Sequence, residues 1–155
     1  MIEMQLNPAV KGFRCSLTQT FYPVSSFTKP VALCACCDRP GKPLVVEYDL
    51  SSISSHHTDQ PGLWKYAPLL PVHTNAAGFG ADVGLTPTLP IQAIGEQMDI
   101  DFFAKYERSN PSGSFKDRGL SVGVALGVAM GAKRFCLPTQ GNAGVAAALF
   151  SARLN

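Results

Sequence analysis

The sequence predicts an α/β fold in which helices flank a parallel β-sheet. The main observation is the order of elements after residue 101: a strand in "DFFAKYE", a helix over residues 116–130, a short strand in "RFCLP" and a helix in "VAAALFSARL". Two turn-forming loops, "SNPSGS" and "TQGNAG", separate each strand from the helix that follows it. This alternation is typical of parallel sheets, which bind ligands at the carboxyl ends of their strands.

The composition is that of a globular chain that can bury a core. Of its 155 residues, 46% are apolar and 15% are charged, which excludes an intrinsically disordered chain. The net charge is only +2, without a basic block, so we predict no binding to nucleic acid. We also predict no membrane association, because no apolar run reaches the roughly 18–20 residues of a membrane span. Five cysteines without a signal-peptide pattern favour a reducing, cytoplasmic location.

The first 90 residues divide into a cysteine-containing region, a linker and a loop-rich stretch. Residues 1–50 contain four of the five cysteines and a predicted strand in "KPLVVEYDL". Residues 51–61 are mostly polar, which is typical of a linker. Residues 62–90 are rich in Pro and Gly, so we expect loops and short segments there.

The loop "NPSGSFKDRG" places Lys116 at the start of a predicted helix. Ser114 and Asp117 have the spacing of a capping box, which predicts that the helix begins at Phe115 or Lys116. The positive end of the helix dipole favours the neutral form of an amine in the first turn. A neutral amine can form a Schiff base with an aldehyde, and Gly113 would let a flat ligand approach the backbone. Taken alone, the loop is explained more simply by a surface lysine in a solvated first turn.

The loop "TQGNAG" precedes an alanine-rich helix whose first N–H groups point into the loop. Such helix amino termini bind carboxylate or phosphate groups. Asn142 has two possible uses, as the helix cap or as a donor to a ligand oxygen. An ordinary turn would explain this loop if it stood alone. Because the two loops follow successive predicted strands, we expect them to face each other and to share a ligand.

Taken together, "SFKDRG" (residues 114–119) and "PTQGNAG" resemble the fold-type II pyridoxal-phosphate enzymes, and among them the threonine synthase family. Two upstream segments, "GLWKYAPLLPV" and "GLTPT" (residues 84–88), resemble further segments of that family. The resemblance covers most of residues 62–155. It implies that these residues are an incomplete pyridoxal-phosphate-enzyme α/β domain, and that residues 1–50 are a degenerate, zinc-ribbon-like cysteine-knuckle region.

The resemblance also implies roles for individual residues. Lys116 would bond covalently to the aldehyde of pyridoxal 5'-phosphate and shuttle protons, Phe115 would pack against the pyridine ring, and Asn142 would hydrogen-bond the ring hydroxyl oxygen. The substrate carboxylate would be bound by the backbone N–H groups of Thr139, Gln140, Gly141, Asn142, Ala143 and Gly144. The implied activity is that of a lyase in threonine biosynthesis, which converts the small amino acid O-phosphohomoserine to threonine and phosphate.

The cysteines match the family only in part. Many of its members open with two Cys-x-x-Cys knuckles, and Cys34-Ala-Cys36-Cys37 resembles the second of them. Only Cys15 remains of the first, with Thr18 where its partner would stand. Three or four thiolates would suffice for zinc, but we favour an eroded ribbon held by packing and predict no metal site.

Members of the family are much longer than this chain, and their cofactor-phosphate loop lies in the later part of the fold. We therefore expect an amino-terminal fragment that is inactive alone, with a homo-oligomer or a completing chain as its partner. A threonine/serine dehydratase-like lyase or a cysteate synthase is the alternative within the same cofactor class. A non-catalytic zinc-ribbon or interaction module is the alternative from a different class. The cysteine-rich start, "YDL" and "GLWKY" favour the synthase.

Overall fold

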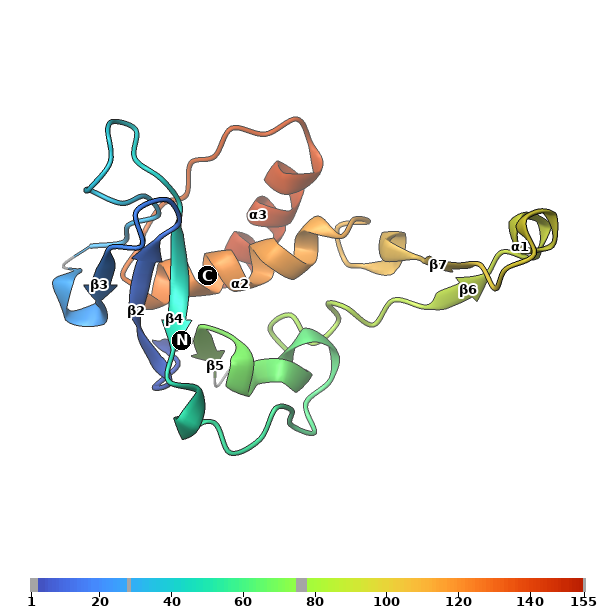
Figure 1. The fold of residues 1–155 in the computed structure, drawn as a ribbon, viewed down its shortest axis with the longest axis horizontal. Coiled ribbons are helices and arrows are strands. Elements are labelled where there is room, and N and C mark those ends of the chain that lie inside the picture. The colour runs from blue at the N-terminus through green and yellow to red at the C-terminus, as the bar shows by residue number, and fades with distance from the viewer. Residues whose placement is uncertain (1–2, 28, 75–77, 155) are drawn as a thin grey trace.

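The computed structural model describes residues 3–27, 29–74 and 78–154. The outer limits of the predicted domains, at residues 1 and 155, and residues 75–77 of the loop-rich stretch lie outside these ranges. Figure 1 shows three parts: a small sheet on one side, two packed helices in the middle and a long arm on the other side. The predicted division at residues 51–61 stays a prediction.

The small sheet contains the cysteine-rich region. It is antiparallel with strand order β3-β2-β4, formed by β2 (Val10–Cys15), β3 (Phe21–Pro23) and β4 (Leu44–Tyr48). The strand predicted in residues 42–50 is therefore confirmed as β4. Phe13 of β2 lies opposite Tyr22 and Val46, and its ring meets that of Phe27 edge-on at 5.3 Å. The Phe13–Phe27 contact packs the segment after η1 against this small sheet and so stabilises it.

The main core lies between the two long helices and the segment that precedes the arm. α2 (Lys116–Ala129) and α3 (Asn142–Ala152) confirm both predicted helices. β1 (Met4–Leu6) and β5 (Val72–Thr74) pair antiparallel beside them. The largest buried side chains of this core include Trp64, Phe79 and Phe150, and their rings follow one another at 6.1 and 5.9 Å. Short 3-10 turns complete the chain: η1 (Val24–Ser26), η2 (Leu50–Ser52), η3 (Gly62–Leu69) and η4 (Glu107–Ser109).

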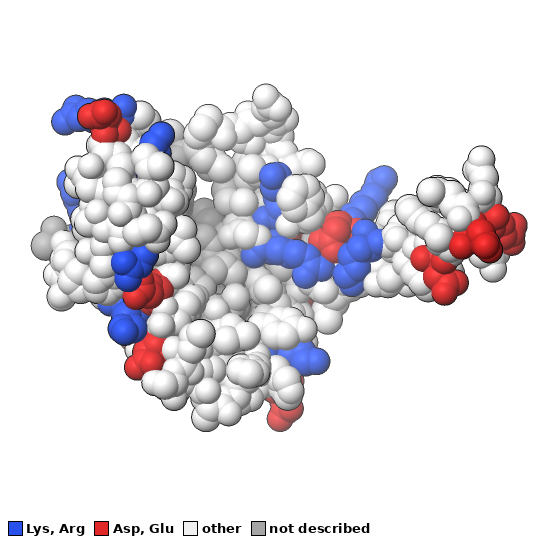
Figure 2. All heavy atoms as spheres, viewed as in Figure 1, with Lys and Arg blue, Asp and Glu red and all other residues white. Residues whose placement is uncertain are grey.

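The arm is an antiparallel pair of strands with a short helix at its tip. β6 (Thr88–Pro90) and β7 (Phe103–Lys105) flank α1 (Gln92–Met98). Figure 2 shows Asp and Glu at the far end of the arm, and Lys and Arg where the arm joins the helices. Apolar side chains on the arm are exposed: Leu89, Ile94, Met98, Ile100, Phe102 and Phe103.

The α/β class is confirmed, but the parallel sheet is wrong for the part of the chain that the structure describes. All strand pairs there are antiparallel, in three separate sheets. The strand predicted at residues 101–107 is shorter in the structure, where only β7 forms and pairs antiparallel with β6. The strand predicted at residues 134–138 is not formed, and this segment has no secondary structure; the Phe135 ring instead lies against Gly127 of α2. Among the described residues, no helix has the length and apolarity needed to cross a bilayer.

Candidate functional site

The first turn of α2 is organised by two serines and a buried acid. α2 begins at Lys116, as predicted, and the Ser114 hydroxyl accepts a hydrogen bond from the Lys116 N–H at 3.3 Å. The predicted capping box is wrong, because the Asp117 carboxylate does not turn back to Ser114. It accepts from the N–H of Ser112 at 2.6 Å and from the Ser112 hydroxyl. Asp117 is fully buried, so its hydrogen bonds with Ser112 hold the loop together in the interior of the protein. The solvated first turn considered from the sequence is therefore wrong for Asp117.

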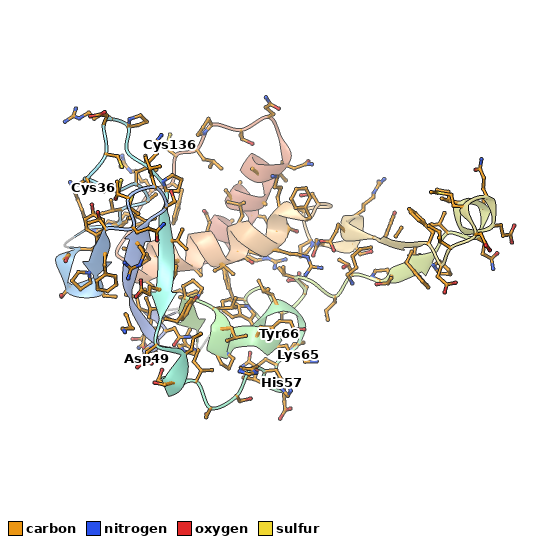
Figure 3. All side chains as sticks on the ribbon, in the orientation of Figure 1. Cys36, Asp49, His57, Lys65, Tyr66 and Cys136 are labelled. Carbon is orange, nitrogen blue, oxygen red and sulfur yellow. The ribbon has the colours of Figure 1, made fainter. Side chains whose placement is uncertain are left out.

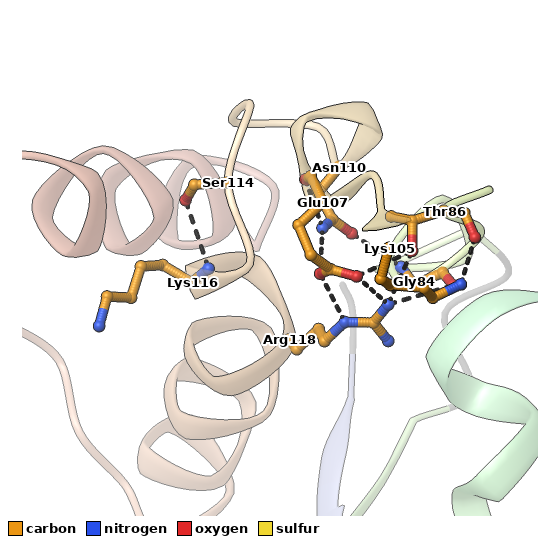
Figure 4. Close-up of polar contacts among 8 residues, drawn as sticks. All are labelled: Gly84, Thr86, Lys105, Glu107, Asn110, Ser114, Lys116 and Arg118. Carbon is orange, nitrogen blue, oxygen red and sulfur yellow. Dashed lines mark hydrogen bonds and ion pairs between the residues drawn. The ribbon is translucent and has the colours of Figure 1, made fainter. Parts of the chain in front are cut away.

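A second set of polar contacts fixes the loop to the chain segment upstream of the arm (Figure 4). Arg118 forms two hydrogen bonds with the Glu107 carboxylate, both at 2.8 Å. Thr86 donates to the same carboxylate at 2.8 Å and accepts from Arg118 at 3.0 Å. Asn110 donates to Glu107 at 2.9 Å and accepts from the Gly84 N–H at 2.9 Å. We call these five residues the Glu107–Arg118 network.

The network holds Glu107 as a carboxylate. Its pKa is lowered to about 2, chiefly by the hydrogen bonds from Arg118 and further by those from Thr86 and Asn110. Sequence reasoning missed Glu107, Thr86 and Asn110 and placed Arg118 in a solvated turn. A usable signal was present, because an arginine near a Gly-rich loop in a chain with few charges needs a partner.

The Lys116 side chain points away from this network (Figure 4). Its Nζ lies 4.5 Å from the centroid of the Phe115 ring, a cation–π contact. Within the described chain, no hydrogen bond or ion pair of this amine is found. Phe115 is 55% exposed, so part of this residue is accessible to a ligand. The structure thus brings together Lys116 and Phe115, two of the predicted cofactor residues.

The second loop is organised by Thr139 and not by Asn142. The Thr139 hydroxyl accepts hydrogen bonds from the N–H groups of Gly141 at 3.1 Å and Gly144 at 2.9 Å. Gly141 is the cap residue of α3, with φ 137°, and Asn142 is the first helical residue, so the expectation that Asn142 caps the helix is wrong. Two of the predicted anion-binding N–H groups are therefore occupied, while those of Asn142 and Ala143, in the first helical turn, have no hydrogen-bond acceptor among the described residues.

Gly144 lies so close to Thr139 that a side chain does not fit. A Cβ added there would lie 2.7 Å from Thr139 Cγ2, and rotating Thr139 would break its two N–H contacts. We expect Gly144→Ala to lower the free energy of unfolding by about 1–3 kcal/mol. Gly123→Ala, in α2 with no atom near the added Cβ, should instead raise it by about 0.5–1 kcal/mol. Urea unfolding of both variants checks the contrast, and equal effects would contradict it.

The two loops are carried by helices that pack on each other. Val124 and Ala125 of α2 and Ala146 and Phe150 of α3 share one buried cluster, and both helices begin on the side of the arm (Figure 1). No hydrogen bond or ion pair between the Lys116 loop and the Thr139 loop is found in residues 3–27, 29–74 and 78–154. The structure therefore positions both loops on one helical layer without bonding them together.

Comparison with known proteins identifies this layer. Residues 81–155, which include both loops, match the family model described as "Pyridoxal-phosphate dependent enzyme". Residues 81–155 are therefore similar to that family. No solved structure matches the chain.

Similar curated proteins carry the name threonine synthase. The chain is 36% identical over 125 residues to that of Methanosarcina acetivorans, which covers 77% of the chain and 30% of the relative. It is 37% identical over 92 residues to the threonine synthase of Bacillus sp. (strain ULM1), and the match covers 59% of this chain and 26% of the relative. It is 30% identical over 127 residues to the threonine synthase of Methanocaldococcus jannaschii, and the match covers 77% of this chain and 30% of the relative. The chain thus spans less than a third of the length of these relatives.

A separate cluster of cysteines lies outside the pyridoxal-phosphate-enzyme region, at the far end of the small sheet. The Sγ atoms of Cys15, Cys34, Cys36 and Cys37 all lie within 4.8 Å of one another. Hydrogen bonds from Thr18 lower the pKa of Cys15 to about 5, whereas the thiol of Cys34 and burial raise the pKa of Cys37 to about 12. The fifth cysteine, Cys136, is exposed and stands apart from this group. Figure 3 labels Cys36 and Cys136.

Proposed function

We propose that this chain carries the cofactor lysine and the substrate loop of a pyridoxal-phosphate-dependent threonine synthase. The proposed reaction converts O-phosphohomoserine and water to threonine and phosphate. The observation that carries the proposal is the contrast between Lys116 and the other polar residues of the Lys116 loop. Asn110, Ser112, Asp117 and Arg118 all have polar partners, whereas the Lys116 amine lies over an aromatic ring and has no hydrogen bond or ion pair among the described residues.

The residues present fit pyridoxal 5'-phosphate. The Lys116 amine, which has no polar partner among the described residues, suits a covalent bond to the cofactor aldehyde, and the half-exposed Phe115 beside it suits packing against a flat pyridine ring. The exposed Asn142 amide suits the ring hydroxyl oxygen. When bound, the cofactor supplies an electron sink for charge at the substrate carbon. Nζ of Lys116 then takes up and returns the protons that the reaction moves.

The second loop supplies the place for the substrate carboxylate. The N–H groups of Asn142 and Ala143, which have no acceptor in the described part of the chain, lie at the positive end of α3, which favours an anion there. Thr139 keeps them in place by holding the N–H groups on either side, of Gly141 and Gly144. Its role is therefore to position the loop, and we propose that Gln140 and Thr139 contribute their own N–H groups at its entrance.

Cofactor attachment at Lys116 tests the proposal. The chain is mixed with pyridoxal phosphate, reduced with borohydride and digested, and the modified peptide is identified by mass spectrometry. We expect the label at Lys116, with an absorbance band before reduction that Lys116→Ala lacks. Lys65→Ala, which removes another exposed lysine, should label normally. Label spread over several lysines, or unchanged in Lys116→Ala, would contradict the proposal. Attachment is measured and not turnover, because the chain spans 30% of the M. acetivorans relative.

The names of the relatives favour a synthase over a dehydratase-like lyase or a cysteate synthase. A chimera in which this chain replaces the matching part of the M. acetivorans enzyme separates them. Threonine and phosphate from O-phosphohomoserine support the synthase, whereas a 2-oxo acid and ammonia from threonine support the dehydratase. Under the same proposal the partners are this small amino acid and a second copy or completing chain, in a reducing cytoplasm.

A further inference from the structure

The four clustered cysteines have the spacing of a metal site and not of disulfides. Cys15 Sγ lies 3.4 Å from Cys34 and 3.7 Å from Cys37, and Cys36 lies 3.9 Å from Cys37. A tetrahedral zinc with Zn–S bonds of about 2.3 Å separates its sulfur atoms by about 3.8 Å. Disulfide sulfurs lie at about 2.05 Å, so all these thiols are free. The four atoms therefore surround a position that one zinc ion fits.

The backbone around the cluster supports negatively charged sulfur. The N–H of Thr18 donates to Cys15 Sγ at 3.4 Å, and the N–H of Lys42 donates to Cys34 Sγ at 3.3 Å. Cys15 and Cys34 are both buried. Donors around ligand atoms orient them and stabilise the thiolate form that a metal requires. A cluster held by apolar packing alone would not need them.

Cys36 explains how a ribbon with only one complete knuckle still provides four sulfurs. Cys34 and Cys37 form a Cys-x-x-Cys pair, whereas Cys15 is followed three residues later by Thr18. Cys36 Sγ lies 3.1 Å from the Thr18 hydroxyl, next to the position that a cysteine at residue 18 would occupy. The additional cysteine in the second knuckle thus stands in for the absent cysteine of the first.

We propose that Cys15, Cys34, Cys36 and Cys37 bind one structural zinc ion, with Cys36 replacing the ligand lost at position 18. Because all four ligand positions are thiolates, no position remains for a substrate, and the ion acts on stability. It links the end of β2 to the loop between β3 and β4. This inference is independent of the proposed function and reverses our sequence-based preference for a metal-free ribbon.

Metal titration of the chelator-treated 155-residue chain under reducing conditions tests the proposal. We expect one Zn²⁺ per chain, and with Co²⁺ the intense visible bands of a tetrahedral thiolate site. Cys36→Ser should weaken Zn²⁺ binding on the order of 100-fold or more. Cys136→Ser, which removes the cysteine outside the cluster, should bind as the unaltered chain does.

A compensating change makes the test specific for the position of Cys36. Thr18→Cys added to Cys36→Ser should restore four sulfurs, returning the Co²⁺ spectrum and bringing the Zn²⁺ affinity to within about tenfold of the unaltered chain. This restoration also shows whether Cys36→Ser failed through the ligand or through misfolding. Absent stoichiometric metal, or a Cys36→Ser chain that binds like the unaltered one, would overturn the zinc site. Failed restoration would overturn the exchange between positions 18 and 36.

Discussion

Phe150→Ala is expected to lower the free energy of unfolding by about 3–5 kcal/mol, the range for truncating a buried aromatic side chain. Phe150 is fully buried in α3. The centroids of the Phe150 and Phe79 rings lie 5.9 Å apart in an edge-on contact. The Arg153 guanidinium also contacts the Phe150 ring, 5.3 Å from its centroid. Truncation would therefore leave a cavity and remove the contact between α3 and the segment that carries Phe79.

Urea or thermal unfolding followed by circular dichroism measures this effect. Phe103→Ala is the matched control, because the same atoms are removed from a ring that is 58% exposed, and its effect should stay within about 0.5 kcal/mol. Phe150→Leu should fall between them, with a loss of about 1.5 kcal/mol or less. A loss for Phe150→Ala no larger than that for Phe103→Ala would show that this core does not hold α3.

Local signals in the sequence predicted α2 and α3 well, but not the short α1 of the arm. α2 and α3 each follow a turn-forming loop and are rich in small apolar residues, and these signals act within a few residues of chain. The start of α2 at Lys116 was predicted for the same reason. The motif around Lys116 predicted the family resemblance, and residues 81–155, which contain this motif, match the model of that family.

Pairing between distant segments could not be read in the same way. The residue types of positions 134–138 favoured a strand, but a strand also needs a second strand to pair with. Residues 134–138 form no strand, and Phe135 packs against Gly127 of α2 instead. Capping was one of two possible uses of Asn142, and the Thr139 hydroxyl takes that role, because it reaches two N–H groups across the turn. Glu107 and Arg118 are 11 residues apart in the sequence and come into contact only when the chain folds. Each of these outcomes depends on three-dimensional approach and not on local propensity.

Glu107→Gln is expected to lower the free energy of unfolding by about 1–3 kcal/mol at neutral pH. The carboxylate accepts hydrogen bonds from Arg118, Thr86 and Asn110, and its side chain is only 24% exposed. The new amide would turn N–H donors toward these donor groups and remove the charge opposite Arg118. The link between the segment around Thr86 and the first turn of α2, which carries Lys116, would weaken, because only the direct contacts of Arg118 with Thr86 and Gly84 would remain.

Asp82→Asn is the matched control for this change. Asp82 also accepts two hydrogen bonds from one arginine, Arg153, at 2.8 and 2.9 Å. Its side chain is 50% exposed, so we expect a loss of about 0–1 kcal/mol. Equal losses in the two variants would contradict a special role for the Glu107–Arg118 network.

The pH dependence separates the charge of Glu107 from its shape. Folding lowers the pKa of Glu107 from its ordinary 4.5 to about 2, so the folded chain binds fewer protons here than the unfolded one. Its contribution is therefore complete above about pH 4.5 and is lost as the pH falls toward 2. The difference in stability between the unaltered chain and Glu107→Gln should shrink over this range. A difference that stays constant down to pH 2 would show that the amide acts through packing, and that the charge of Glu107 does not hold the lysine loop.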